Sequence, residues 1–107
     1  MNTNYLPLNI SVSKNELKKE NLCIMNAEGQ DLKNIIYSFL NYIDNFQQVA
    51  ADNGASEDFL NELMSHYSII EILYKFPVNE TLTKKNRNHI RLIMKEVISN
   101  SAGYNIN

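Results

Sequence analysis

The feature that most constrains the fold is a regular apolar stripe near the middle of the chain. Large apolar side chains recur every three or four residues, at Leu32, Ile35, Ile36, Phe39, Leu40, Ile43 and Phe46. This spacing returns to one side of an α-helix at each turn, so we predict an amphipathic helix over residues 30–53. Asp31 in the first turn suits the helix dipole, and Gly54 is placed to end the helix with a left-handed cap.

Two more helices are predicted downstream, over residues 56–76 and 82–99. Ser56 is a favourable N-cap for the first of these, and Pro77 would stop it. Thr81 or Thr83 could cap the second. The second half of segment 56–76 is apolar around its whole circumference, which indicates either a central helix or a helix that meets a partner.

The N-terminal part is less regular. Residues 1–13 partly alternate between polar and apolar, which favours an extended segment or a short edge strand. Ser13 and Glu16 match a capping box, so we favour a helix over 14–25, with a short strand at 21–25 as the alternative. The expected fold is therefore a single all-α domain over residues 1–107. It is a small three- to four-helix bundle, with a short N-terminal β segment as an option.

Composition narrows the function classes. The chain has 107 residues, a formal net charge of −2 and one cysteine, Cys23. This charge argues against general nucleic-acid or polybasic membrane binding. A lone cysteine cannot form an intramolecular disulfide. No apolar run approaches the roughly 20 residues of a membrane span, so we expect a cytoplasmic protein.

The sequence contains no pattern that indicates catalysis. Glu62 and His66, spaced i and i+4, could form half of a carboxylate-bridged metal site, but no second half is evident. The isolated glycines Gly29 and Gly54 suit turns better than a phosphate-binding loop. We therefore predict a protein that is not an enzyme and has no catalytic residues, no metal site and no cofactor.

Charge is segregated along the chain. Residues 44–80 contain seven acidic residues and one lysine, whereas residues 81–95 contain five basic residues and no acid. In a helix over 82–99 the side chains of Lys84, Arg87, Arg91 and Lys95 would share one side, opposite the apolar residues. That side is expected to be solvated, or to bind a macromolecule of opposite charge.

The leading hypothesis is a non-enzymatic protein-binding module, a small cytoplasmic inhibitor of the toxin-immunity or phage-inhibitor type. Richness in Asn, Ile and Lys is typical of AT-rich accessory genes of bacteria or phages. The predicted partner-binding residues are Asp52, Glu57, Asp58, Glu62, Tyr37 and Tyr42. One alternative is a DNA-binding regulator that uses Lys84, Arg87, Arg91 and Lys95. Another is a structural subunit that forms a homodimer through the second half of segment 56–76.

Overall fold

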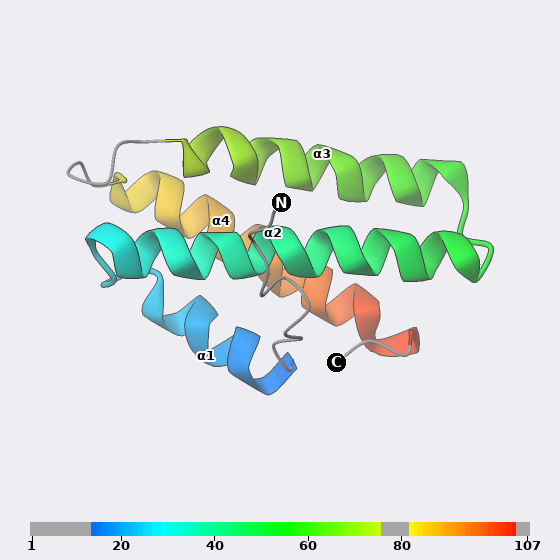
Figure 1. The fold of residues 1–107 in the computed structure, drawn as a ribbon, viewed down its shortest axis with the longest axis horizontal. Helices are drawn as coiled ribbons and strands as arrows, with labels where there is room; N and C mark the ends of the chain where they lie inside the picture. Colours follow the sequence, from blue (N-terminus) through cyan, green and yellow to red (C-terminus); the bar gives the residue numbers. More distant parts are fainter. Residues whose placement is uncertain (1–13, 76–81, 105–107) are drawn as a thin grey trace, which may run out of the picture.

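The computed structural model describes residues 14–75 and 82–104, and in these ranges the fold is a bundle of four α-helices (Figure 1). They are α1 (Lys14–Cys23), α2 (Gly29–Asp52), α3 (Glu57–Tyr74) and α4 (Lys84–Asn100), and a short 3-10 turn, η2 (Ser101–Gly103), follows α4. No strand occurs in the described part, so the all-α prediction is confirmed. The extended segment predicted for residues 1–13 and the predicted stop at Pro77 lie outside the described residues.

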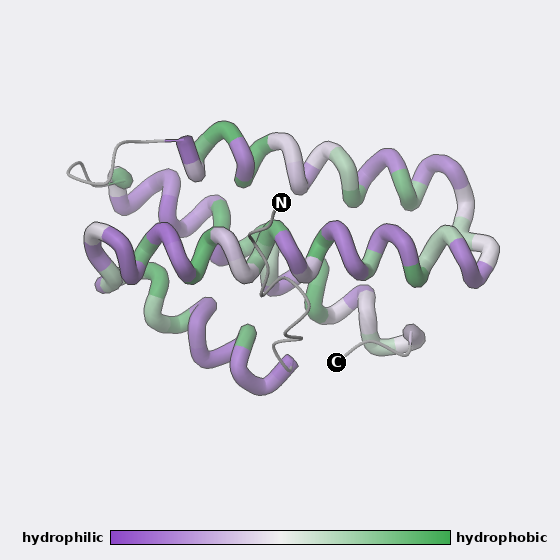
Figure 2. Tube along the Cα trace, in the orientation of Figure 1, coloured by the Kyte–Doolittle hydropathy of each residue, from purple (hydrophilic) through white to green (hydrophobic). Residues whose placement is uncertain are grey.

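α2 is the central helix of the bundle. α3 lies along one side of it, α1 lies along the other, and α4 crosses behind it (Figure 1). All seven members of the apolar stripe are buried, and Phe39, Ile43 and Phe46 are fully enclosed. In Figure 2, green apolar segments alternate with purple hydrophilic ones along α2, as the spacing of the stripe requires. The stripe predicted from the sequence supplies seven of the 19 buried apolar residues in the described part of the chain.

α1 is a helix, as predicted for residues 14–25. The alternative of a strand at residues 21–25 is wrong, because residues 21–23 belong to α1 and residues 24 and 25 lie in the turn after it. Leu17, Asn21 and Ile24 are spaced i, i+4 and i+7, and all three are buried. Asn21 donates its side-chain N–H to the carbonyl of Arg91 on α4, at 3.0 Å. The apolar pattern of α1 was weak because a polar residue that hydrogen-bonds to the backbone occupies the middle of its buried side.

α4 begins at Lys84, two residues after the start that the sequence predicted for the helix over 82–99. Thr83 is its N-cap, and its hydroxyl accepts a hydrogen bond from the backbone N–H of Asn86 at 3.1 Å. At the other end, the Ser101 hydroxyl lies 2.7 Å from the Tyr42 hydroxyl and donates to the carbonyl of Ile98. Buried polar contacts of this kind fix the last turn of α4 against α2.

Candidate functional site

The turn between α2 and α3 brings the predicted acidic residues together. Gly54 has a φ of +80°, the left-handed conformation that favours glycine. The N–H of Ala55 then returns to the carbonyl of Ala50 at 3.0 Å. Ser56 caps α3, and its hydroxyl accepts from the N–H of Phe59 at 3.2 Å. The roles predicted for Gly54 and Ser56 are confirmed.

This turn presents an acidic surface, defined as Asp52, Glu57, Asp58 and Glu62. All four side chains are exposed. Asp52 is the last residue of α2, and the other three lie in the first two turns of α3. Carboxylates in the first turn of a helix are favoured by the helix dipole, so Glu57 and Asp58 stabilise α3 as well as charging its surface.

The outward side of α3 is apolar beyond its first turns. Met64, Ile69 and Ile72 are 41%, 36% and 69% exposed, and we refer to them as the apolar face of α3. Ser65 and Ser68, which lie between them on the same side of the helix, are exposed and uncharged. α3 is therefore not the central helix. The other option from the sequence, that its second half meets a partner, stays a prediction, and the exposed Ile69 and Ile72 lie in that half.

The two tyrosines predicted to bind a partner take other positions. Tyr42 is only 5% exposed, and its hydroxyl lies against Ser101. The position faces the core, so the burial of Tyr42 argues against the predicted interface role. Tyr37 is half-buried and stacks on Tyr74, with ring centroids 6.1 Å apart. Tyr37 therefore contributes to the packing between α2 and α3.

The predicted basic side of α4 is only partly on the surface. Lys84 and Lys95 are exposed. Arg91 is half-buried, and its guanidinium donates to the side chain of Asn88. Arg87 is 3% exposed, so its placement on the outer side was wrong.

The guanidinium of Arg87 is a structural group. It donates to the carbonyls of Leu82, Ile24 and Ala27 at 3.0, 3.0 and 2.6 Å, and it pairs with Glu28 at 3.3 Å. These contacts join the start of α4 to the connection between α1 and α2. The planar guanidinium can satisfy several carbonyls at once, which explains why an arginine occupies this buried position.

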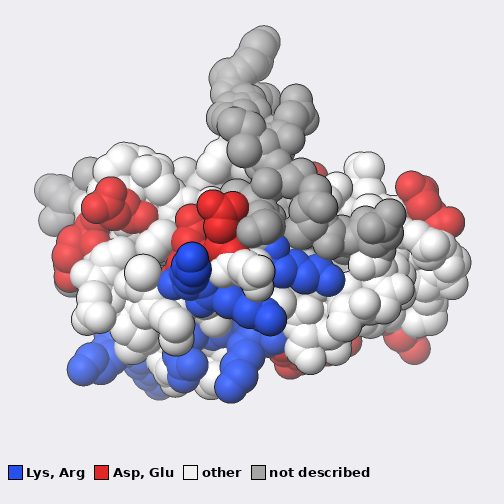
Figure 3. Space-filling view, turned by 90° about the horizontal axis from the view of Figure 1, so that it is seen from below, with Lys and Arg blue, Asp and Glu red and all other residues white. Residues whose placement is uncertain are grey.

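The lysines of α1 join those of α4 because the two helices pack together. We define the basic face as the exposed side chains Lys18, Lys19, Lys84, Lys85 and Lys95. Figure 3 shows lysine and arginine side chains gathered on one face of the molecule, seen from the α1 side. Only the α4 part of this face is apparent in the sequence, since α1 and α4 lie far apart in the chain.

Charge is therefore divided between two pairs of helices. α2 and α3 contain seven acidic residues and one lysine, a formal −6, whereas α1 and α4 contain eight basic and three acidic residues, a formal +5. The pKa of Tyr67 on α3 reflects the acidic residues of α2 and α3. Burial raises its pKa, and the nearby carboxylates of Glu71 and Asp44 raise it further. The two pairs of helices therefore carry formal charges of opposite sign.

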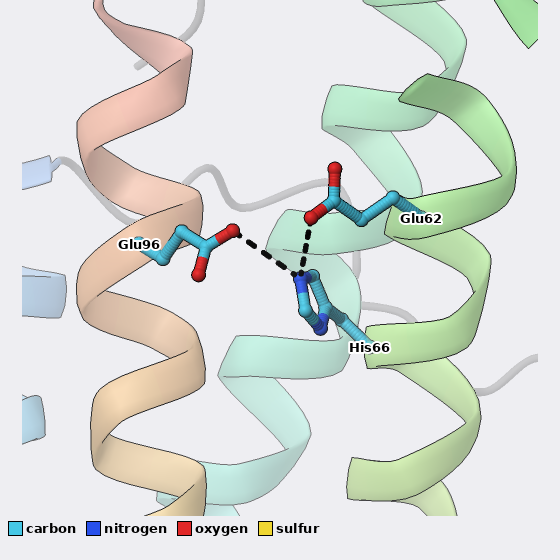
Figure 4. Close-up of side chains that lie close together, drawn as sticks. All are labelled: Glu62, His66 and Glu96. Atoms are coloured by element: carbon cyan, nitrogen blue, oxygen red, sulfur yellow. Dashed lines mark ion pairs between the residues drawn. The ribbon is translucent and has the colours of Figure 1, made fainter. Parts of the chain in front are cut away.

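A histidine lies between two carboxylates where α3 meets α4 (Figure 4). The Nε2 atom of His66 is 3.9 Å from a carboxylate oxygen of Glu62 and 3.8 Å from one of Glu96. We call these three residues the His66 cluster. Both ring nitrogens of His66 are buried without a hydrogen-bond partner, while the two glutamates are half-exposed.

Only half of this cluster is apparent in the amino-acid sequence. The spacing of Glu62 and His66 on one helix was visible, but no second half was expected. Glu96 comes from α4, and nothing in its local sequence indicates a link to His66. Only the packing of α3 beside α4 brings the third side chain into place.

Comparison of the chain with protein-family models, curated proteins and solved structures gave no significant match. In the described part of the chain, every helix is too short or too polar to cross a lipid bilayer.

Proposed function

We propose that the protein is a non-enzymatic protein-binding module that docks through α3 on a basic protein surface. The observation that carries this proposal is the outward side of α3. There the apolar face (Met64, Ile69 and Ile72) continues directly into the acidic surface. Protein interfaces combine an apolar centre with a polar rim in this way, and a cluster of exposed large apolar side chains is costly in water unless something covers it.

The charge of the α2–α3 side favours a basic partner over a second copy of the chain. A two-fold dimer through α3 would place two helices, each with a formal charge of −4, against each other. Repulsion between like charges disfavours such a dimer. A basic partner surface would instead associate with α3 faster and more specifically, because the two charges are complementary. The homodimer predicted as an alternative is therefore the weaker candidate.

Within this class, we propose a small cytoplasmic inhibitor of the toxin-immunity or phage-inhibitor type. Its acidic surface would cover a basic functional site, such as that of a nuclease, and block it by occlusion. The free thiol of Cys23 is exposed, which suits a reducing compartment.

The test is affinity capture from nuclease-treated lysate of the native host with matched variants. We expect one stoichiometric protein partner with the wild-type chain. Its recovery should be lost with Ile69→Ser/Ile72→Ser and with Glu57→Lys/Asp58→Lys, and should persist with Lys84→Ser/Lys95→Ser. The purified pair should then bind more weakly at high salt, because rim charges are screened.

Other outcomes would contradict the proposal. Equal capture by the wild type and both α3 variants would show that α3 is not the docking surface. A wild-type chain that sediments as a dimer, and as a monomer after Ile72→Glu, would assign the apolar face to self-association.

A second candidate, nucleic-acid binding, is favoured by the basic face. The exposed lysines of α1 and α4 lie on the same side of the bundle (Figure 3). This extends the predicted basic side of α4, although Arg87 is not available to it. Here the expected result is duplex DNA binding that weakens steeply with salt and is lost in Lys84→Ser/Lys95→Ser. If Lys84→Ser/Lys95→Ser binds DNA as well as the wild type, the basic face is not the DNA-binding surface.

A further inference from the structure

We propose that the His66 cluster binds one divalent transition-metal ion, with Zn²⁺ as the best match, between α3 and α4. Glu62 and His66 come from successive turns of α3, and Glu96 comes from α4. One ligand atom from each residue lies within 4.8 Å of the other two. In Figure 4 the imidazole lies between the two carboxylates, and each dashed line ends on the same ring nitrogen.

The distances suit a shared ion better than direct contacts. The Nε2 atom of His66 is 3.9 and 3.8 Å from the carboxylate oxygens, which is too long for a hydrogen bond. Two ligand atoms on one tetrahedral zinc ion lie about 3.4 Å apart, given metal–ligand bonds of about 2.1 Å. The two His66 distances exceed this spacing by about 0.5 Å, and the two carboxylate oxygens, which lie within 4.8 Å of each other, exceed it by at most about 1.4 Å. Small rotations of the two glutamate side chains would therefore bring the three groups to bonding distance of one ion.

The burial of His66 is the second, independent observation. Its side chain is 17% exposed, and both ring nitrogens are buried without a hydrogen-bond partner. A buried polar atom without a partner is costly, so a native structure normally satisfies it. A cation on Nε2 would provide that partner, and the half-exposed carboxylates leave a route for the ion to enter.

The donor set defines the class of ion. A neutral imidazole suits zinc, copper, iron and nickel, whereas Mg²⁺ and Ca²⁺ prefer oxygen ligands alone. Two carboxylates would neutralise the charge of a divalent cation. Three protein ligands leave at least one coordination position for water or another ligand atom. Binding requires the unprotonated imidazole, so affinity should fall as the pH is lowered.

The experiment is titration of the full chain with Zn²⁺, with Mg²⁺ as the comparison ion. Binding is followed by calorimetry, by thermal unfolding and by the ¹⁵N chemical shift of the His66 ring. We expect one Zn²⁺ per chain, a rise in Tm of roughly 5 °C at saturation and a shift of the His66 resonance, with no response to Mg²⁺. Glu96→Gln should weaken Zn²⁺ binding at least about tenfold, and so should Glu62→Gln.

Matched variants separate this site from other zinc donors. Glu71→Gln, also on α3, should bind Zn²⁺ like the wild type, as should Cys23→Ser and His89→Gln. Since Glu96 is half-exposed, Glu96→Gln is expected to fold, which its circular dichroism would confirm. The proposal is overturned if Zn²⁺ leaves the His66 resonance unchanged, if Glu96→Gln binds as well as the wild type, or if Cys23→Ser or His89→Gln abolishes binding.

Discussion

α2 and α3 are neighbouring helices, both rich in large apolar residues, yet they are used differently. α2 buries nine of its 24 residues, whereas α3 buries only Leu63 and Ile70 among its 18. α2 has other helices on several sides, while α3 packs mainly on α2 (Figure 1). The position of a helix in the bundle, more than its apolar content, therefore determines whether it keeps exposed apolar side chains that a partner could contact.

Lys33 and Tyr37 on α2 hold the end of α3 in place. The Lys33 ammonium donates to the carbonyl of Tyr74 and lies 4.5 Å from the centre of its ring. Tyr37 stacks on the same ring. α3 is thus fixed along its inner side, which leaves the apolar face of α3 available without loosening the helix.

The largest expected effect comes from breaking the central helix. Phe46 is fully buried, and its ring meets those of Phe59 and Tyr104 edge-on. Phe46→Ala should lower the free energy of unfolding by about 3–5 kcal/mol, because it leaves a cavity in the core. Ile72→Ala, on the apolar face of α3, should change it by less than about 0.5 kcal/mol. Urea unfolding measures both, and similar losses would mean that Ile72 is not on the surface.

The next effect concerns the attachment of α4. Arg87→Met removes the donors that satisfy buried carbonyls at the start of α4 and between α1 and α2. We expect a loss of about 2–4 kcal/mol, measured by urea unfolding. Lys84→Met, on the exposed side of the same helix, is the control and should be nearly neutral. If the two variants are equally stable, the guanidinium contacts contribute little.

A smaller effect is expected at the start of α3. Ser56→Ala removes the side-chain acceptor of the Phe59 N–H and should cost about 1 kcal/mol. Ser68→Ala makes the same chemical change on the exposed side of α3 and should be neutral or slightly stabilising. Thermal unfolding of both variants tests this prediction. If Ser68→Ala lowers the Tm as much as Ser56→Ala does, the loss of the N-cap is not the cause of the destabilisation.

The smallest effect is expected on α1, at Glu20. Burial, with a contribution from Glu16, raises the pKa of the Glu20 carboxyl above its ordinary value of 4.5. The folded state therefore holds this proton more tightly than the unfolded state, and stability falls as the pH rises through the interval above 4.5.

Glu20→Gln removes the cost of holding an ionised carboxylate at this partly buried position. At pH 7 it should raise the free energy of unfolding by roughly 0.5 kcal/mol, because the carboxyl is still partly exposed. The gain should disappear below pH 4.5, where both states are protonated. Unfolding curves over this pH range provide the test. A gain that stayed constant with pH would point to a cause other than the carboxylate charge.

The sequence predicted the elements whose signal is local. The stripe of α2 and the caps at Ser56 and Thr83 depend on residues within a few positions of one another, so the pattern was sufficient. Arg87 and Tyr42 were misplaced because each lies at the edge of its helix. Whether a side chain at the boundary between the buried and the exposed side of a helix is covered depends on the neighbouring helix. The local sequence pattern holds no information about that neighbour.

The all-α fold, the three main helices and the segregation of charge follow from the amino-acid sequence, since periodicity, capping and charge are properties of neighbouring residues. The central position of α2 and the exposed apolar face of α3 follow from the way the helices pack. The same packing places the lysines of α1 beside those of α4, and Glu96 beside His66. The physical reason is that these relations join residues far apart in the chain, and only packing of the helices around one core brings them together.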